Sequence, residues 1–569
     1  MASSSNLSAP PGAAIAAKRG IWGRQLDHYP ANGPRAGYLA IVVLTTITLY
    51  YELYVQGSVA PVLAANMHMT LVFLLSISIV GNALGALASV LAGLADRWGR
   101  ANLVVYGLAV TGALVLFGLA EAGNKWVYMA MFVSVGFVEG IMLVATPALI
   151  RDFSPQLGRA SAMCFWTMGP VLGSFVVSEV ASHTLETHTD WQYQFRVCGV
   201  VGLAVFVIAF VGLRELAPRL RDQIMVSLND KALIEANARD IDPDEAPSGH
   251  WRRMLRKDIV GSAVAISLSL LFYYVAVGLF VVFFATNFGY SGAQANALSN
   301  WYWGANAVTL LVTGILSDAL RVRKPFMLLG GVSGAVGVAL FAIAATHPGT
   351  TYYEFVGILM PISIGGGLVF ASWMAAFTET VEKHDPAATA TGLAVWGATL
   401  RSTVVVALFS LMVMIPAAST LVGEGPQVAT VAAGQDPGLS AGENATVKAI
   451  AADPSILTHV KTTASEYGPA LHDPKVAAAL KFLQAEAPAV KQAQKDSPAQ
   501  WQRWLWIAFA GQVLFIPLIW LLTGRWSPKK ARQDAREHAE AVGQRLAALG
   551  TVGAVGALGA AGAVSEPIG

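Results

Sequence analysis

The sequence has little charge for its length. Of its 569 residues, 13% are charged and 55% are hydrophobic, whereas a soluble domain carries about 25% charged residues. We therefore expect most of the chain to lie in a lipid bilayer. The formal net charge of +2 comes from short basic clusters between apolar segments, not from one basic face, which argues against nucleic-acid binding.

Cysteine is almost absent, and two common functional phrases are missing. Only Cys164 and Cys198 occur, both in apolar segments, and two such residues provide neither a disulfide framework nor the spacing of a zinc site. The sequence also lacks a Gly-x-x-x-x-Gly-Lys-Ser/Thr loop and a His-Glu-x-x-His phrase, which bind nucleotide and zinc respectively. We therefore expect no cofactor, no metal and no enzyme activity.

Long apolar segments fill most of the chain. A membrane-spanning helix needs roughly 20 mostly apolar residues, and twelve segments qualify, six on each side of a polar linker. They are 37–64, 69–95, 101–121, 126–150, 158–182, 193–214, 258–286, 292–317, 325–346, 352–378, 386–416 and 503–523. The sequence thus predicts an all-α integral membrane protein with twelve transmembrane helices.

Loop charges predict the orientation of these helices. Lys and Arg recur in every second short loop, in the N-terminal tail 1–36, in the linker 215–257 and in the C-terminal tail 525–569. Loops rich in Lys and Arg stay on the cytoplasmic side of a membrane. We therefore expect a multi-pass protein of the cell (inner) membrane, with both termini and the linker in the cytoplasm.

This division gives two bundles of six helices, at 37–214 and 258–524. The second bundle contains a long insert, 417–500, on the side opposite the basic loops. Its Ala-rich stretch 475–495 is compatible with a helix, while Gly, Pro and Asp recur before it. We expect a partly ordered external cap.

Nearly the same phrase ends one apolar segment in each half. The first copy, from Ala92 to Arg100, reads Ala-Gly-Leu-Ala-Asp-Arg-Trp-Gly-Arg, and the second begins at Gly314 as Gly-Ile-Leu-Ser-Asp. Both copies lead into a basic turn. Such a doubled membrane unit is typical of transporters.

The twelve segments and the doubled phrase resemble the major facilitator superfamily over about residues 36–524. The family pattern is Gly-x-Leu-Ala-Asp-Arg-x-Gly-Arg, and Ala92 replaces its first glycine. The matching residues, which are candidate gating residues, are Asp96, Arg97, Gly99 and Arg100 in the first copy and Gly314 and Asp318 in the second. The resemblance implies two six-helix bundles related by a pseudo-two-fold axis, a monomer, and a cluster at these phrases that latches the cytoplasmic side. A topology anchor is the alternative role of this cluster.

The segment 158–182 carries a second candidate gating element. Gly169, Pro170 and Gly173 form a Gly-Pro-x-x-Gly-Ser phrase that is similar to the Gly-Pro-x-x-Gly-Gly element of proton-antiporting members of the family. Pro170 lacks the backbone donor and bends its helix. The phrase favours export by proton antiport.

Three ionisable side chains lie near the middle of predicted helices: Glu52, Glu139 and Arg401. Each is about 13–15 residues from a helix end, or roughly 20 Å deep, where a charge is costly unless it faces a partner or a wet cavity. The family resemblance implies that they could share one central cavity. We expect Glu52 or Glu139 to carry the coupled proton and Arg401 to hold an anionic substrate or neutralise a glutamate; a static buried ion pair is the alternative.

Polar and aromatic side chains at matching places extend this candidate site. Tyr51 flanks Glu52, and helix 258–286 carries a tyrosine pair. Buried hydroxyl groups need partners, so these residues are candidates for the cavity wall, although tyrosines also gather at membrane interfaces. The added candidates are Tyr51, Tyr273, Tyr274 and Asn306.

These features predict a secondary active transporter that moves a small organic solute together with protons across the bilayer, and Arg401 favours an anion. A proton-antiporting exporter of drugs or amphiphilic compounds is the nearest alternative. A non-transporting receptor built on a transporter fold is a further one. The sequence does not identify the solute or the direction of transport.

The latch hypothesis predicts the effect of Asp96→Asn. An isolated carboxylate at the C-terminal end of a helix is disfavoured by the helix dipole and needs a cationic partner, so loss of its charge should lower the turnover of transport while the amount of protein in the membrane persists. Transport in vesicles, normalised to immunodetected protein, measures this. A variant that transports at the wild-type rate contradicts the latch.

Overall fold

The computed structural model describes residues 23–90, 99–153, 159–217, 255–384, 389–453, 473–522, 524–533, 536–537 and 540. Three predicted gating residues, Ala92, Asp96 and Arg97, lie outside the described residues. Most of the predicted linker and most of the C-terminal tail also lie outside them.

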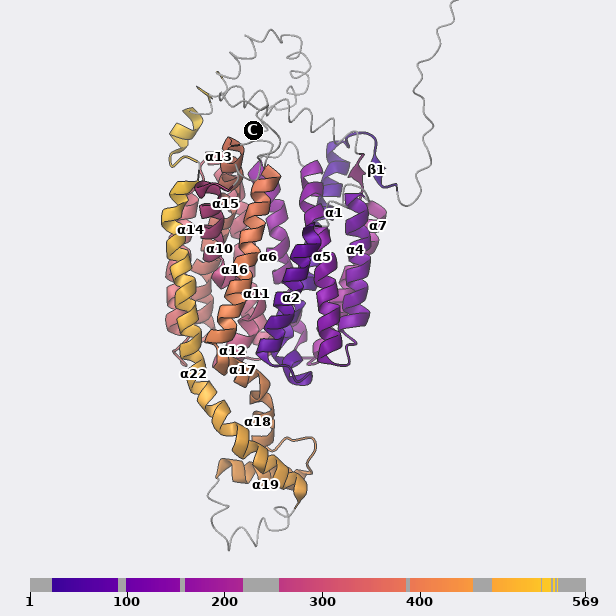
Figure 1. The fold of residues 1–569 in the computed structure, drawn as a ribbon, viewed down its shortest axis with the longest axis vertical. Coiled ribbons are helices and arrows are strands. Elements are labelled where there is room, and N and C mark those ends of the chain that lie inside the picture. Colours follow the sequence, from indigo (N-terminus) through magenta and orange to yellow (C-terminus); the bar gives the residue numbers. More distant parts are fainter. Residues whose placement is uncertain are drawn as a thin grey trace, which may run out of the picture.

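Helices occupy all six predicted segments of the first half. They are α1 (Asn32–Asn66), α2 (Leu71–Val90), α4 (Arg100–Ala113) with its π-helical continuation η2 (Leu114–Leu119), α5 (Lys125–Phe153), α6 (Arg159–Thr184) and α7 (Trp191–Gly212). In Figure 1 these helices, in indigo and purple, stand side by side on one side of the molecule.

Helices also occupy the six predicted segments of the second half, which forms the other side of the molecule (Figure 1). They are α10 (Lys257–Ser269), α11 (Leu271–Gly278), α12 (Phe280–Phe288), α13 (Gly292–Leu320), α14 (Lys324–Ala344), α15 (Tyr352–His384), α16 (Thr389–Met414), and α22 (Pro474–Leu518) with the short 3-10 helix η7 (Ile519–Leu521).

The helices have the length and composition of membrane spans. Among the described residues, nine are long and apolar enough to cross a membrane, or ten if the bent pair α10 and α11 forms one span. Many of their large apolar side chains, among them Phe117, Val211 and Ile315, are more than 60% exposed. Apolar side chains exposed in this way suit contact with lipid, which confirms the prediction of an all-α membrane protein.

A two-stranded parallel sheet is the one departure from the all-α prediction among the described residues. Strand β1 (Gln25–Leu26) pairs with β2 (Glu215–Leu216), so the segment before α1 is tied to the segment after α7. Arg24 strengthens this contact, because its guanidinium lies 4.4 Å from the ring centroid of Phe210 and donates a hydrogen bond to the Phe210 carbonyl. Strands of two residues are too short to leave a recognisable pattern in the sequence.

The segment 258–286, predicted as one helix, is broken into three. The axes of α10 and α11 meet at 43°. A break leaves backbone groups without helical partners, and here the Gln512 side chain of α22 donates a 2.6 Å hydrogen bond to the Ser269 carbonyl. At the second break α1 comes so close that a Cβ at Gly57 would lie 2.5 Å from the Val277 carbonyl oxygen.

Glycines let α2 and α5 touch along their backbones. A Cβ at Gly85 would lie 2.9 Å from the Gly136 carbonyl oxygen, and a Cβ at Gly140 would overlap the Gly85 backbone. Such small-residue seams permit close helix packing in membranes. The seam fixes the position of α5, which carries Glu139.

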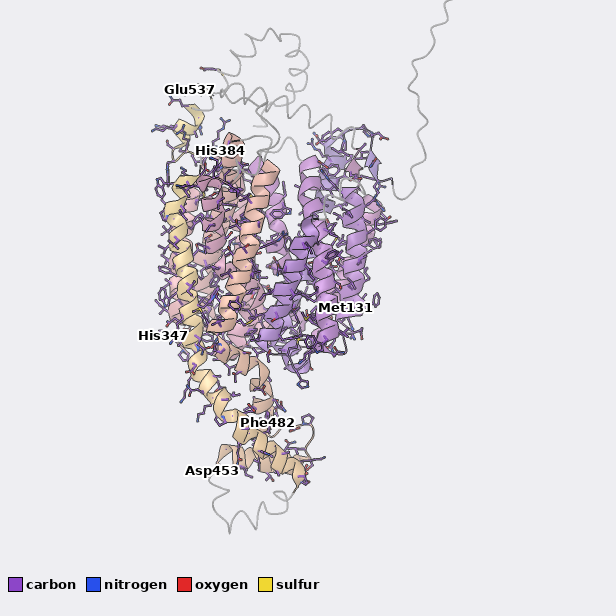
Figure 2. The ribbon with its side chains drawn as sticks, viewed as in Figure 1. Met131, His347, His384, Asp453, Phe482 and Glu537 are labelled. Carbon is purple, nitrogen blue, oxygen red and sulfur yellow. The ribbon has the colours of Figure 1, made fainter. Side chains whose placement is uncertain are left out.

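We call the end of the bundle where α4 begins and α13 ends the signature end, because Arg100 and Asp318 lie there. The opposite end, from which the insert projects, is the insert end. Figure 2 shows Asp453 and Phe482 in the projecting insert, whereas His384 and Glu537 lie at the signature end.

The insert is a small helical unit with its own apolar core. It comprises α17 (Pro416–Gly423), α18 (Gly425–Ala432), α19 (Ala441–Ala452) and the first part of α22. The buried core residues include Leu421, Val447, Ile450, Val476 and Leu483. The insert is therefore more ordered in its described residues than the sequence led us to expect.

The last membrane helix does not begin at residue 503 as predicted. Helix α22 begins at Pro474 and runs for 45 residues into the membrane domain, a length of about 68 Å at 1.5 Å per residue. It contains Pro488, Pro498 and Pro517, which favour helix breaks in a soluble context. The apolar stretch begins only near residue 503, so the sequence predicted the span without the polar first part of this helix.

The insert also contains a Gly-x-Ser-x-Gly phrase at residues 438–442, which hydrolases use to present a nucleophilic serine after a strand. Here the Ser440 side chain accepts a hydrogen bond from the Glu443 backbone, and the Glu443 carboxylate accepts one from the Ser440 backbone. This capping box begins α19, and the Ser440 hydrogen bonds lower the pKa of the exposed Glu443. Ser440 is therefore a helix cap.

The glycine seam predicts a specific stability difference. Gly140→Ala places a methyl group against the Gly85 backbone and should lower the free energy of unfolding by about 1–3 kcal/mol. Gly357→Ala, in α15, is the control because a Cβ there meets open space and alanine favours a helix by up to ~1 kcal/mol. Thermal unfolding of the purified protein measures both; equal melting temperatures would contradict the seam.

Candidate functional site

The first signature phrase is held within the first half. Gly99 has a φ of +87°, and a Cβ there would lie 2.5 Å from Glu215 Oε1. Glu215 accepts a 2.7 Å hydrogen bond from the Arg100 backbone at the start of α4, where a carboxylate suits the helix dipole. The Arg100 side chain forms a 3.1 Å ion pair with Asp152 of α5.

The second phrase is held within the second half. Asp318 forms a 2.7 Å ion pair with Arg323, and Arg323 forms a further 3.0 Å ion pair with Glu379 of α15. Arg323 also donates a 2.7 Å hydrogen bond to the Ser317 hydroxyl. Gly314 is buried one turn earlier in α13. Each of these three ion pairs thus joins residues of the same half.

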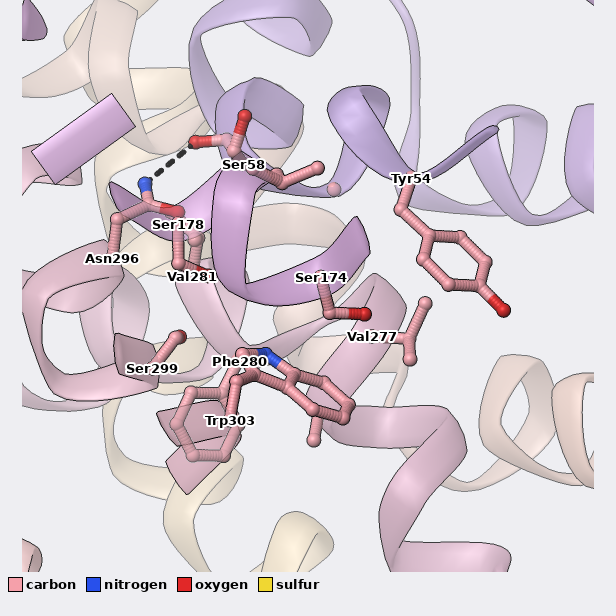
Figure 3. Close-up of a pocket in the computed structure, with 13 residues that line it drawn as sticks. Tyr54, Ser58, Ser174, Ser178, Val277, Phe280, Val281, Asn296, Ser299 and Trp303 are labelled. Atoms are coloured by element: carbon pink, nitrogen blue, oxygen red, sulfur yellow. Dashed lines mark hydrogen bonds between the residues drawn. The ribbon is translucent and has the colours of Figure 1, made fainter. Parts of the chain in front are cut away.

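A cavity lies where the two halves meet (Figure 3). It is lined by α1, α6, α11, α12 and α13, through Tyr54, Gly57, Ser58, Ser174, Val177, Ser178, Ala276, Val277, Phe280, Val281, Asn296, Ser299 and Trp303. Its volume is about 20 Å³, which holds about one water molecule and is far below the ~300–1,000 Å³ of ligand pockets.

Hydrogen bonds between the halves lie beside this cavity, towards the insert end. Asn296 of α13 donates to the Ser58 carbonyl of α1 at 3.0 Å, as Figure 3 shows. One turn further along α13, Asn300 donates to Glu179 at 2.7 Å and to Ser182 at 3.0 Å, both on α6. In the described residues, these contacts hold the halves together near the insert end.

Tyr50 connects two of the predicted charges. It lies within electrostatic range of Glu139 on α5 and of Arg401 on α16, which belong to opposite halves. Glu139 is 1% exposed, and no hydrogen bond reaches either of its carboxyl oxygens among the described residues. Tyr54, one turn along α1, interacts with Glu139 as well. Glu139 and Arg401 therefore face the same tyrosine.

Glu52 lies on another side of α1, inside the first half. It is fully buried beside the Thr111 hydroxyl of α4, yet neither of its carboxyl oxygens has a hydrogen bond of good geometry among the described residues. A Cβ at Gly202 of α7 would overlap Glu52 Oε1. Glu52 still interacts electrostatically with Glu139. The buried ring of Tyr51 interacts with Cys198 of α7, so it faces the same interior.

The remaining predicted residues occupy the second half. The Tyr54 hydroxyl lies beside the Tyr273 hydroxyl, which places α1 next to α11. The Tyr273 ring packs edge-on against Trp303, a cavity residue, at 5.3 Å. Tyr274 is adjacent, and its hydroxyl has no hydrogen-bond partner among the described residues. Asn306 donates a 2.9 Å hydrogen bond to the Ser363 carbonyl, which joins α13 to α15.

The Gly-Pro-x-x-Gly phrase of α6 packs against α1 next to Tyr50. A Cβ at Gly169 would overlap Thr46, and a Cβ at Gly173 would lie 2.5 Å from the Tyr50 Cβ. Pro170 lies inside α6 between these two contacts. The phrase therefore sets the distance between α6 and the tyrosine that faces Glu139 and Arg401.

Sequence reasoning missed several residues of this site. Asn296 and Ser58 were not selected, because a polar side chain near a helix end has many structural roles. The spacing of Asn296 and Asn300, four residues apart on one face of α13, could have indicated a polar contact along this helix.

Comparison with known proteins then settles the family. A sequence model described as Major Facilitator Superfamily matches residues 42–406. The chain belongs to the major facilitator superfamily. Its paired bundles and doubled phrase are those expected of this superfamily. The named relatives that the chain resembles are transporters, not enzymes.

Curated relatives are distant. The chain is 24% identical over 228 residues to Sugar phosphate exchanger 3 of Gallus gallus, covering 36% of this chain and 44% of that protein. It is 23% identical over 271 residues to the High-affinity nicotinic acid transporter of Saccharomyces cerevisiae, covering 45% of this chain and 50% of that protein. The chain thus spans about half the length of the curated relatives that it matches.

Solved structures of superfamily members share the fold. A bacterial homolog to the human lysosomal transporter Spinster, in an inward-facing and unoccupied conformation, matches with a TM-score of 0.52 and 15% identity, covering 88% of this chain and 100% of that chain. The occupied form of that protein gives a TM-score of 0.50. Because the sequences are only 15% identical, this likeness establishes the fold alone.

The contacts of Asn300 predict how the insert end opens. In a variant with both cysteines replaced by alanine, Ser178→Cys places a thiol at the cavity. Adding Asn300→Ala removes the hydrogen bonds to α6 and should raise the rate of labelling by a water-soluble maleimide about fivefold, the shift produced by ~1 kcal/mol of lost hydrogen bonding.

The matched control for this experiment is Asn66→Ala, because the Asn66 amide bonds only to Val62 of its own helix at 2.8 Å. It should leave the labelling rate unchanged. An equal labelling rate in the Asn300→Ala variant and its parent would show that these contacts do not close the insert end.

Proposed function

We propose that the protein is a secondary active transporter that moves a small organic anion coupled to protons. The observation that carries the proposal is the series of charged and hydroxyl groups that crosses the interface between the halves. It consists of Arg401, Tyr50, Glu139 and Glu52, each in electrostatic range of the next.

Two carboxyl groups in this series support proton coupling. Glu52 and Glu139 are at most 1% exposed and lack hydrogen bonds of good geometry among the described residues. An ionised carboxylate without a partner is costly inside a membrane protein, and such residues commonly mark proton relays. Glu139 is the better candidate for coupling to substrate, because it shares Tyr50 with Arg401.

Arg401 supports an anionic substrate. A guanidinium group stays charged and binds carboxylate or phosphate groups in a fixed geometry. The names of two relatives, a sugar phosphate exchanger and a nicotinic acid transporter, both denote organic anions. We therefore infer an organic anion of this size class, bound between the two halves.

The two halves, 37–214 and 258–524, would expose this site alternately to the two faces of the membrane. In this conformation the hydrogen bonds from α13 to α1 and α6 lie near the insert end. At the signature end, the Arg100–Asp152 and Asp318–Arg323 ion pairs each lie within one half. This difference supports rocking of the halves about the interface that contains Tyr50.

We further propose that the protein acts as a monomer in the cell (inner) membrane, with the signature end and both termini in the cytoplasm. The basic residues Arg321, Arg323 and Lys324 follow α13 at the signature end. This placement agrees with the rule that Lys and Arg concentrate in cytoplasmic loops.

Export by proton antiport is the second candidate. The Gly-Pro-x-x-Gly phrase of α6 contacts α1 beside Tyr50, so the element that resembles proton antiporters lies next to the proposed proton and substrate site. Transport in inside-out and right-side-out vesicles separates the two directions. An antiporter accumulates solute in vesicles that are acidic inside, because protons leave as solute enters, whereas a symporter accumulates solute in vesicles that are alkaline inside.

Glu139→Gln tests the proton role. In proteoliposomes with an imposed pH gradient, the variant should lose accumulation of solute, because glutamine cannot bind and release the coupled proton. Exchange of labelled for unlabelled solute without a gradient should persist, since the binding groups on the other helices remain. Uptake and counterflow measured on the same preparation give both results.

The matched control is Glu121→Gln. The Glu121 side chain is 55% exposed and forms an ion pair with Arg196 outside this site. It should retain accumulation driven by the pH gradient. Undiminished accumulation by the Glu139→Gln variant would remove Glu139 from the coupling mechanism.

A further inference from the structure

Three tryptophan rings meet where α6, α15 and α16 come together. The ring centroids of Trp166 and Trp396 are 6.5 Å apart, in an edge-to-face arrangement that joins the first half to the second. Trp373 of α15 lies 5.5 Å from Trp396. Neither Trp166 nor the other two rings has a role in the transport site described so far.

The indole N–H groups of these rings are buried without acceptors. The Nε1 atoms of Trp166, Trp373 and Trp396 have no hydrogen-bond partner among the described residues. Buried indole donors usually find a partner, as in Trp504, whose Nε1 donates to the Ser410 hydroxyl at 3.0 Å. Unsatisfied buried donors are costly, and three of them on rings that pack around Trp396 indicate a place where an acceptor from outside the chain can bind.

The tryptophan cluster lies close to Arg401 along the helices. Trp396 precedes Arg401 by five residues of α16, about 8 Å of helix axis. Trp166 precedes Gly169 by three residues of α6, and Gly169 packs against α1 one turn before Tyr50. The Trp166–Trp396 contact joins α6 to α16 and the Tyr50–Arg401 interaction joins α1 to α16. Both therefore lie at the interface between the halves, about 8 Å apart along α16.

We infer that Trp166 and Trp396 form the second part of the substrate site and hold the body of the anion whose charged group binds Arg401. This inference rests on the proposed function and adds the substrate class. The solute carries hydrogen-bond acceptors for the indole N–H groups and a flat face that packs on the rings. A planar aromatic carboxylate and a sugar phosphate both have this chemistry.

The test replaces each ring by one that lacks the donor. Trp166→Phe and Trp396→Phe keep an aromatic face but remove the indole N–H. The KM for the transported anion should rise about five- to twentyfold, the usual effect of losing one hydrogen bond to a charged or polar ligand, while the maximal rate stays within about twofold. Thermal stability without solute should be unchanged or higher, because an unsatisfied donor has been removed.

Trp504→Phe is the matched control. It replaces another buried tryptophan of the second half but breaks the hydrogen bond to Ser410. It should lower the thermal stability and leave KM unchanged. Opposite effects at the two kinds of tryptophan separate substrate binding from a purely structural role.

Labelled nicotinate and labelled glucose 6-phosphate are the probes, tested separately in proteoliposomes of the full chain. Uptake of either probe with a raised KM in both Trp→Phe variants supports the inference, and the probe that is taken up distinguishes an aromatic carboxylate from a sugar phosphate. Uptake with an unchanged KM in both variants overturns the inference while the proposed function stands. Absence of uptake of both probes by the wild-type protein, with uptake of a cationic or neutral solute, overturns the anionic class itself.

Discussion

The structure depends on one constraint, which is the presence of a few ionisable groups inside an otherwise apolar bundle of helices. Most backbone groups in such a bundle are satisfied within the helices, so the ionisable side chains of Glu52, Glu139 and Arg401 stand out in a mostly apolar interior. Glu52 lies near the middle of α1, Glu139 near the middle of α5 and Arg401 near the middle of α16. The energetic cost of these groups is the reason to expect function at the interface between α1, α5 and α16.

Small residues place these charges. Gly85 and Gly140 bring α2 and α5 into backbone contact, and Gly173 brings α6 against Tyr50. Gly202 leaves room for the Glu52 carboxyl. Because a methyl group at these positions would displace a neighbouring helix or a carboxyl group, the positions of the charges follow from where glycine occurs.

Much of the fold could be predicted from the sequence. Segments of roughly 20 apolar residues predicted where helices lie, since the bilayer sets their length, and nine or ten helices among the described residues qualify as spans. The doubled phrase predicted the superfamily. The breaks near Ser269 and Val277 could not be predicted, because neither contains proline and both depend on contacts from Gln512 and Gly57. The length of α22 could not be predicted either, because its prolines favour a break that the insert core prevents.

The candidate site could be predicted in part. Hydropathy alone identified Glu52, Glu139 and Arg401, but it does not give the direction of a side chain around its helix. The structure brings Glu139 and Arg401 to Tyr50 and directs Glu52 towards Gly202, inside the first half. The tryptophan donors were missed because an apolar ring in an apolar helix gives no signal until its unpaired N–H is seen.

The most direct test of the account is the internal pH of proteoliposomes during solute flux. A pH-sensitive dye trapped inside the vesicles reports proton movement when the transported anion is added outside, with no gradient imposed. The account predicts a change in internal pH that begins with solute entry, acid for symport and alkaline for antiport, and that saturates with the solute. Solute flux at constant internal pH would contradict coupling between the buried carboxyl groups and the substrate.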